Sequence, residues 1–214
     1  MSTFPRHLFD EPDPDPNTLD NLGPLRALAG IWENDQGEDV KPTADGAEAQ
    51  RYIERIELQP IDPQTNGPQL FYGLRYHTRI VKPGEVDMYH EQVGFWLWEP
   101  ATGAILQSLA IPRGQIALAK GQAAADARNF TLTSGRGSTE NGICSNAFLE
   151  ENFRTDRFDI TITVHDDDSW SYDETTVLAI KGVPEPFMHT DRHTLHRVAQ
   201  PTPNPMALAA RGND

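Results

Sequence analysis

The pattern that decides the fold lies in residues 158–180, FDITITVHDDDSWSYDETTVLAI. Apolar and polar side chains alternate from residue 158 to residue 164, so every second side chain lies on the same face of an extended strand. A polar turn at residues 165–169 leads into a second alternating run. Two such runs joined by a short polar turn are typical of a β-hairpin. We therefore predict two antiparallel strands, each with one buried face.

The same alternation recurs outward from this hairpin. The other clear strand candidates are residues 69–80, 86–99, 104–111, 115–121, 129–135 and 187–198. Helical periodicity is confined to one or two short turns, at residues 17–29 and 146–152. In all, about ten strands joined mostly by tight turns predict an all-β fold, an antiparallel up-and-down β-barrel, because closure removes exposed sheet edges. A barrel of this size encloses space that its own side chains do not fill, so we expect a ligand there.

The two ends of the chain have a different composition. Residues 1–20 are acidic and proline-rich, which disfavours both helix and strand, so we expect an arm that is disordered or lies extended on the domain. Residues 200–214 are expected to form a flexible, unstructured tail. The predicted barrel domain spans residues 21–199.

Overall charge excludes some partners. The chain has 214 residues, with 18 Lys and Arg against 32 Asp and Glu, a formal net charge of −14. This balance argues against binding to nucleic acid or to an anionic membrane surface. No apolar run approaches the roughly 20 residues that span a bilayer, and the N-terminus lacks the apolar core of a signal peptide. The single cysteine, Cys144, favours a reducing compartment, so we expect a cytoplasmic protein.

Trp32 is the first residue singled out for a role in the barrel. It belongs to the sequence Gly30-Ile31-Trp32 at the start of the first strand. Such a tryptophan can plug one end of a small ligand-binding barrel, with Arg197 from the last strand over its ring in a cation–π contact. The alternative is a tryptophan that only packs in the core.

The histidines are the other candidates. On a strand, His90 shares its face with Met88, Gln92 and Trp96, where it is either a hydrogen-bonded core residue or a ligand. The segment 187–198 has three histidines. A helix there would place all three on one face. We favour a strand, on which His189 and His193 share a face and His196 lies on the other. A structural zinc site is disfavoured because four convergent ligands are lacking.

Several motifs in this order resemble the nitrobindin family. They are LRALAGIW at residues 25–32, HEQVGFW at 90–96, IPRGQIALAKG at 111–121, and a last strand ending in HRV at 196–198. The resemblance covers nearly the whole predicted domain. It implies a ten-stranded barrel of the fatty-acid-binding or lipocalin type that holds haem b at one open end and binds nitric oxide. It also implies isomerisation of peroxynitrite to nitrate, so a haem-dependent peroxynitrite isomerase is the enzyme hypothesis.

The resemblance also implies positions for haem-binding residues. His90 stands four residues before Gly94 and matches a family histidine near the haem pocket. The family's iron ligand on the last strand falls at Thr190, and a one-residue shift would bring the adjacent His189 inward. We therefore expect His189 to be the metal ligand. The expected haem-binding set comprises His189, His90, Thr190, Trp32, Met88 and Trp96.

The sequence also departs from the family pattern. Gln92 stands where the family has glutamate, and the glycines that follow the family tryptophan are replaced or displaced after Trp32. These departures favour an alternative, a haem-free carrier of a small hydrophobic ligand or acid, with Arg113 or Arg75 as a carboxylate partner. Both interpretations place a small molecule inside the barrel, and both are compatible with a homodimer.

Overall fold

The computed structural model describes residues 4–212, and strands dominate it. Its strands are β1 (Gly30–Thr43), β2 (Gly46–Pro60), β3 (Gln64–Asn66), β4 (Gln69–Val81), β5 (Met88–Glu99), β6 (Ala104–Ile111), β7 (Gln115–Gln122), β8 (Asn129–Arg136), β9 (Gly142–Ser145), β10 (Phe153–Val164), β11 (Ser169–Ile180) and β12 (Phe187–Ala199). Its helices are η1 (Arg6–Phe9), α1 (Thr18–Asn21), η2 (Gly23–Leu28), α2 (Ala147–Asn152) and α3 (Pro205–Arg211). None of these helices is long and apolar enough to span a membrane.

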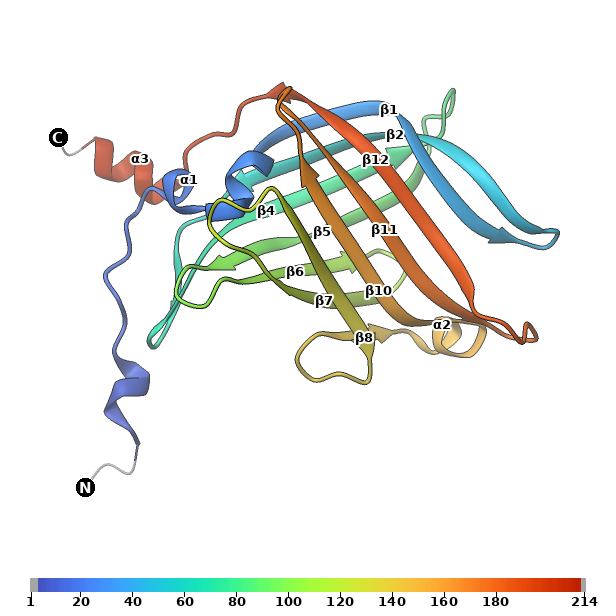
Figure 1. Cartoon of the computed structure of the whole chain (residues 1–214), viewed down its shortest axis with the longest axis horizontal. Helices are drawn as coiled ribbons and strands as arrows, with labels where there is room; N and C mark the ends of the chain where they lie inside the picture. The colour runs from blue at the N-terminus through green and yellow to red at the C-terminus, as the bar shows by residue number, and fades with distance from the viewer. Residues whose placement is uncertain (1–3, 213–214) are drawn as a thin grey trace.

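The strands close into a barrel (Figure 1). β1 pairs with both β12 and β2, and β2 pairs onward with β4, which joins the two ends of the sheet. The predicted antiparallel up-and-down barrel is confirmed, with two differences. Within the part of the chain that the structure describes, β3 pairs only with β4, and the short β9 lies beside β8 in parallel. The predicted hairpin of residues 158–180 is the pair β10 and β11.

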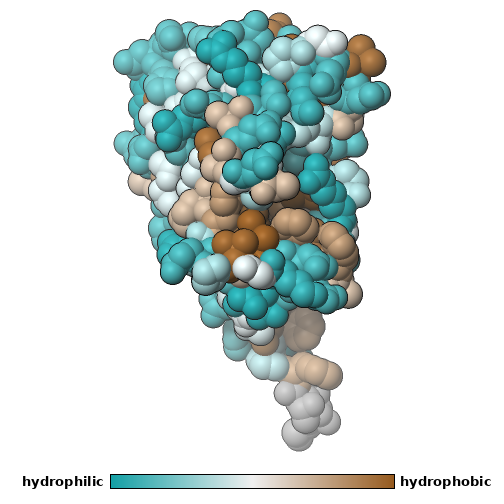
Figure 2. Space-filling view, turned by 90° about the vertical axis from the view of Figure 1, so that its right-hand side faces the viewer, coloured by the Kyte–Doolittle hydropathy of each residue, from teal (hydrophilic) through white to brown (hydrophobic). Residues whose placement is uncertain are grey.

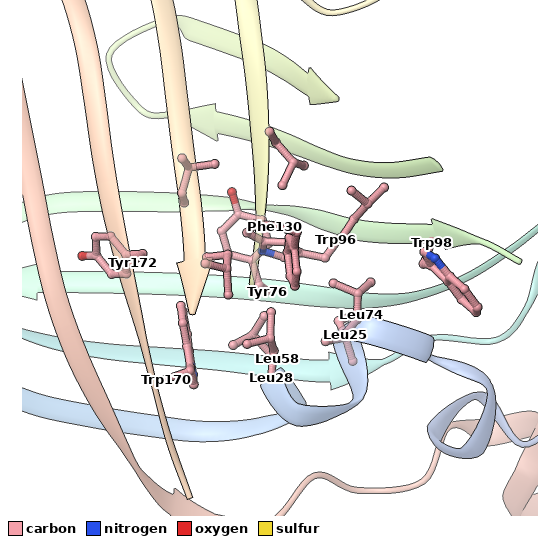
Figure 3. Packing of buried hydrophobic residues seen from close by; sticks show 14 of the residues in the cluster. Leu25, Leu28, Leu58, Leu74, Tyr76, Trp96, Trp98, Phe130, Trp170 and Tyr172 are labelled. Carbon is pink, nitrogen blue, oxygen red and sulfur yellow. The ribbon is translucent and has the colours of Figure 1, made fainter. Parts of the chain in front are cut away.

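One end of the barrel is plugged by the 3₁₀ helix η2. Its Leu25 and Leu28 are fully buried and point toward Leu58 on β2 and Leu74 on β4 (Figure 3). Because these leucines fill the space between the strands, the hydrophobic core lies at this end and leaves the other end free.

Trp32 lies next to this plug. Its indole Nε1 donates a hydrogen bond to the Leu28 carbonyl oxygen at 2.8 Å. The Arg197 guanidinium lies 4.0 Å from the Trp32 ring centroid, so the predicted cation–π contact is present. Arg197 also donates to the Ala29 carbonyl, which ties β12 to the end of η2. Trp32 is therefore part of the hydrophobic core beside the plug.

The segment after β12 differs from its prediction. Instead of remaining unstructured, it forms helix α3, because Asn204 anchors its start in a buried position. The Asn204 side chain accepts a hydrogen bond from the Thr18 backbone N–H and donates to the Pro16 carbonyl and to Asp62 Oδ1. It thereby joins the arm, the barrel and the C-terminal helix. The outermost residues of the two predicted terminal segments, 1–3 and 213–214, lie outside the described residues.

Asn204→Ala is expected to release both terminal segments without unfolding the barrel. The substitution removes three hydrogen bonds from a side chain that is 1 % exposed and leaves the Asp62 carboxylate without one of its donors. Limited proteolysis should cut near residues 16–18 and after residue 200 at least several-fold faster than in the parent protein. Met206→Ala, at an exposed position of α3, is the control. Equal cleavage rates in the two variants would contradict the anchoring role.

Candidate functional site

A cavity of about 640 Å³ occupies the barrel between the plug and the open end. Figure 2 faces the open end and shows hydrophobic residues, in brown, around a hollow in a mostly hydrophilic surface. The apolar wall includes Ile56, Trp96, Leu109, Phe158, Ile160 and Leu178. The polar wall includes Asp39, Tyr52, Glu54, Tyr89, His90, Arg113, Tyr172, Glu174, His189 and Asp191. This volume is within the range of pockets for small organic ligands.

His189 points into this cavity and is held by two carboxylates. Its Nε2 lies 2.8 Å from Asp39 Oδ1 on the neighbouring β1 and 3.4 Å from Asp191 Oδ2. Tyr89 donates from its hydroxyl to the second oxygen of Asp39 at 2.5 Å. Burial alone would lower the pKa of His189, but the bond to Asp39 and the charge of Asp191 outweigh it and raise the pKa.

The same bonds act on Asp39 in the opposite sense. Burial opposes its ionisation, but hydrogen bonds from His189 and Tyr89 outweigh this effect and lower the pKa of Asp39. Asp39 is therefore an ionised carboxylate although its side chain is only 5 % exposed. A buried carboxylate of this kind is stable only while its hydrogen-bond donors remain in place.

Deeper in the wall, Glu54 is the centre of a second network. Tyr172 donates to Glu54 Oε2 at 2.9 Å, and the Nδ1–H of His193 donates to the same oxygen at 2.8 Å. Because Tyr172 uses its only hydroxyl proton on Glu54, Tyr52 must donate to Tyr172, across 2.7 Å. These four side chains are buried, so the network fixes the wall of the cavity.

Two further carboxyl groups make the cavity acidic. Burial, and then the nearby carboxylates, raise the pKa of Glu174 well above its ordinary value. Burial also raises the pKa of Asp191 to about 7, with the charges of Asp39 and Glu54 adding to the effect and His189 opposing it. Acidic groups are rarely gathered in an enclosed space without a function, because their mutual repulsion costs stability.

His90 lies in the same cavity in a different environment. Burial and then the positive charge of Arg113 lower its pKa, so the imidazole is neutral. His90 and its neighbour Tyr89 both line the cavity, although adjacent strand residues normally face opposite sides. The register between β4 and β5 shifts at this point, and such a bulge re-aims side chains.

The structure places three of the six expected haem-binding residues in the cavity wall: His189, His90 and Trp96. Thr190 lies between the inward-facing His189 and Asp191 and so belongs to the outer face of β12. His189 faces the cavity without the one-residue shift expected from the sequence, because the pairing of β11 with β12 is continuous through His189 and Thr190. Trp32 lies in the plug, and Met88 is 38 % exposed; neither lines the cavity.

Several residues of the site escaped the sequence analysis, above all Asp39, Glu54, Glu174 and Asp191. A signal for two of them was present. Glu54 and Glu174 occupy positions where the alternation assigns the side chain to the buried face, beside Tyr52 and Tyr172 respectively. A charged residue on the buried face of a strand is uncommon and marks a candidate functional position. No such signal could show that the four carboxyl groups converge.

Comparison with known proteins shows which family the chain belongs to. Among curated proteins, no sequence is significantly similar to this chain. Among solved structures, the crystal structure of Rv2717c from M. tuberculosis is similar with a TM-score of 0.57 and 20 % identity, covering 86 % of this chain and 99 % of the other. At this identity the similarity shows the fold alone. A family model described as "THAP4-like, heme-binding beta-barrel domain" matches residues 21–197.

That match covers nearly all of the barrel and its plug, because it begins at the last residue of α1 and ends two residues before the end of β12. It agrees with the nitrobindin-like character expected from the sequence. The chain therefore belongs to the THAP4-like, heme-binding β-barrel domain family.

Proposed function

We propose that the barrel binds haem b in its interior cavity, where the His90 imidazole would hold the iron. The observation that carries this proposal is the neutral imidazole of His90 in the wall of an interior cavity of about 640 Å³. Haem iron takes an imidazole as a protein ligand, and the nitrogen must be unprotonated to bind. Burial keeps His90 in that form.

The surroundings of His189 favour His90 over it for this role. The sequence expectation made His189 the iron ligand, and the side chain does face the cavity. Its Nε2 is directed at Asp39 and Asp191, so two carboxyl groups already engage the nitrogen that would have to bind iron. By contrast, no carboxylate of residues 4–212 forms an ion pair with His90.

The remaining walls suit a flat apolar ring with two acidic substituents. Trp96, Leu109 and Ile160 supply an apolar surface that excludes water from the inner part of the cavity. Lys41 and Arg113 also line the cavity, and they are the cations available to the propionates. Arg75, the other cation expected from the sequence, lies on the outer face of the barrel.

Bound there, haem would supply an iron centre that takes nitric oxide or peroxynitrite as a ligand, the chemistry that the family resemblance implies. The protein's own contribution is to hold one imidazole in its neutral form and to keep water from the inner wall. Peroxynitrite is an anion, and the chain has a net charge of −14. Arg113 therefore also offsets the field that repels such a substrate.

A hemin titration followed by absorbance tests the proposal. The parent protein is expected to develop a shifted Soret band that saturates at one haem per chain. His90→Ala should lose that band or weaken haem affinity at least tenfold, whereas His189→Ala should retain it. His77→Ala, on the outer face beside Glu91, is the matched control. Absence of a band in the parent protein would refute haem binding, and loss of the band only in His189→Ala would refute the assignment to His90.

A second candidate function, a haem-free carrier of a small ligand, is favoured by one observation. The carboxyl groups of Glu54, Glu174 and Asp191 make one wall of the cavity acidic, which disfavours a porphyrin with two carboxylates of its own. Mass spectrometry of a solvent extract of the purified protein separates the two functions. Recovered protoporphyrin would support the haem proposal, and a recovered lipid or aromatic acid would support the carrier.

A further inference from the structure

We propose that Asp39, His189 and Asp191 form a binding site for one non-haem divalent transition-metal ion in the wall of the cavity. The site is separate from His90 and does not depend on whether the cavity also binds haem. One ligand atom from each residue lies within 4.8 Å of the other two. The three residues contribute one imidazole nitrogen and two carboxylate oxygens.

The distances fit a shared metal ion. Protein nitrogen and oxygen ligands lie about 2.0–2.2 Å from zinc, so neighbouring ligands around one ion are roughly 3 Å apart. The His189 nitrogen lies 2.8 Å from the Asp39 oxygen and 3.4 Å from the Asp191 oxygen. A metal ion placed among these atoms would replace the proton that His189 now shares with the two carboxylates. Small side-chain movements suffice for this exchange.

The backbone holds the three residues in register. Asp39 on β1 is paired directly with Asp191 on β12, and His189 lies two residues along β12 on the same face. Both strands are in the middle of the closed sheet, so the spacing between the ligands is fixed by main-chain hydrogen bonds. A site on paired strands is more rigid than one assembled from loops.

Asp39 also has the outer support that metal ligands commonly have. The hydroxyl of Tyr89 donates to Asp39 Oδ2, the oxygen that does not contact His189. Ligating carboxylates in proteins are usually oriented by such a bond from a neighbouring group. Tyr89 is therefore a positioning residue, which holds the other carboxylate oxygen toward His189.

A separate observation points to a bound molecule in the same cavity. Gln107 Oε1 and Trp170 Nε1 are buried atoms without a hydrogen-bond partner among residues 4–212, and both residues line the cavity. Each side chain is 2 % exposed. Buried polar atoms are almost always paired, so one unused acceptor and one unused donor indicate a missing polar partner. Trp170 packs against Trp32 at the plugged end, six residues along the β11–β12 pairing from His189, so this partner is a separate polar molecule in the inner part of the cavity.

The acidic ligands of the site favour a cation as well. Asp39 and Asp191 each offer a carboxylate oxygen beside the His189 nitrogen. A divalent ion is often the largest local charge in a protein site, and it would favour the ionised forms of the two carboxyl groups that ligate it. One nitrogen and two oxygen ligands suit Zn²⁺, Fe²⁺, Mn²⁺ or Co²⁺ rather than a soft ion held by sulfur.

Cobalt titration of the metal-free, haem-free protein tests the site directly. Protein stripped with a chelator and then dialysed is titrated with Co²⁺, followed by its visible ligand-field absorption, and in parallel with Zn²⁺ by calorimetry. We expect saturation at one ion per chain. Asp39→Asn, His189→Gln and Asp191→Asn should each weaken binding at least 100-fold, and Tyr89→Phe about tenfold, the size of outer-partner effects.

Asp173→Asn is the matched control, because Asp173 is an exposed carboxylate on β11 that contacts Arg192 on the outer face. It should bind Co²⁺ as the parent does. Near-UV circular dichroism establishes that each variant is folded. Absence of stoichiometric binding in the parent overturns the proposal whatever the variants do. Weak binding of several ions that the three substitutions leave unchanged also overturns it, since such binding belongs to surface carboxylates.

The experiment also separates this proposal from haem binding. It uses protein without haem, so failure of the hemin titration leaves the expected cobalt result unchanged. If the protein does bind haem through His90, a saturating amount of Zn²⁺ should leave the Soret band of that haem unchanged. Displacement of one equivalent of haem by one equivalent of Zn²⁺ would show that both ligands depend on His189, and would overturn the separation of the two sites.

Discussion

Trp32→Ala is expected to lower the free energy of unfolding by about 3–5 kcal/mol, the range for tryptophan truncation in a core. The side chain is 1 % exposed and meets Trp170 edge to face at a centroid distance of 6.1 Å. Truncation opens a cavity beside the plug and leaves the Leu28 carbonyl without its indole donor. It also removes the ring under Arg197. Urea denaturation followed by far-UV circular dichroism measures the loss.

Two further variants divide this effect into its parts. Trp32→Phe keeps most of the apolar volume and loses the hydrogen bond, so a loss of about 1–2 kcal/mol is expected. Arg197→Met keeps the aliphatic stem and loses the cation–π contact, which contributes roughly 0.5–2 kcal/mol, together with the ion pair to Asp168. A loss below about 1 kcal/mol in Trp32→Ala would show that the plug is not part of the cooperative core.

Glu54→Ala is expected to lower the free energy of unfolding by about 3 kcal/mol. The substitution leaves the Tyr172 hydroxyl and the His193 Nδ1–H without an acceptor, and each unpaired buried donor costs about 1–3 kcal/mol. Within the described part of the chain His193 Nε2 has no partner, so the His193 side chain would lose its one hydrogen bond there. For a domain of this size the melting temperature should fall by about 2–4 °C per kcal/mol.

The control for Glu54 lies on the same strand. Glu57 faces outward from β2, is 44 % exposed and pairs with Arg55. Exposed ion pairs contribute little, so Glu57→Ala should change the stability by less than about 1 kcal/mol. Glu54→Gln keeps the shape and one acceptor oxygen and should fall between the two. If Glu54→Ala and Glu57→Ala melt at the same temperature, the buried network does not stabilise the barrel.

Local pattern was enough to predict the strands. The alternation of residues 158–164 buries Phe158, Ile160 and Ile162 on one face of β10, because side chains alternate across any extended strand. The same rule placed His189 and His193 on one face of β12 and His196 on the other, and the structure shows that the shared face is the inner one. The contact between Trp32 and Arg197 was also predicted, from their positions on the first and last strands of a closing barrel.

Features that depend on long-range pairing were not predicted. Asn204 reads as part of a polar tail, and only its burial between the arm and Asp62 explains the helix that follows. The shift that turns both Tyr89 and His90 inward arises in the pairing of β4 with β5. Neither feature has a signature in its own segment, because the partner that stabilises it is distant in sequence.

The sequence by itself determined that the chain is a barrel of antiparallel strands, which side chains of a strand lie on the same face, and that two histidines of the last strand share one face. A period of two residues carries that information locally. Only the tertiary structure decided that Asp39 lies opposite Asp191 and within reach of His189, some 150 residues along the chain. The register of β1 against β12 is fixed by barrel closure, and closure is a property of all the strands together.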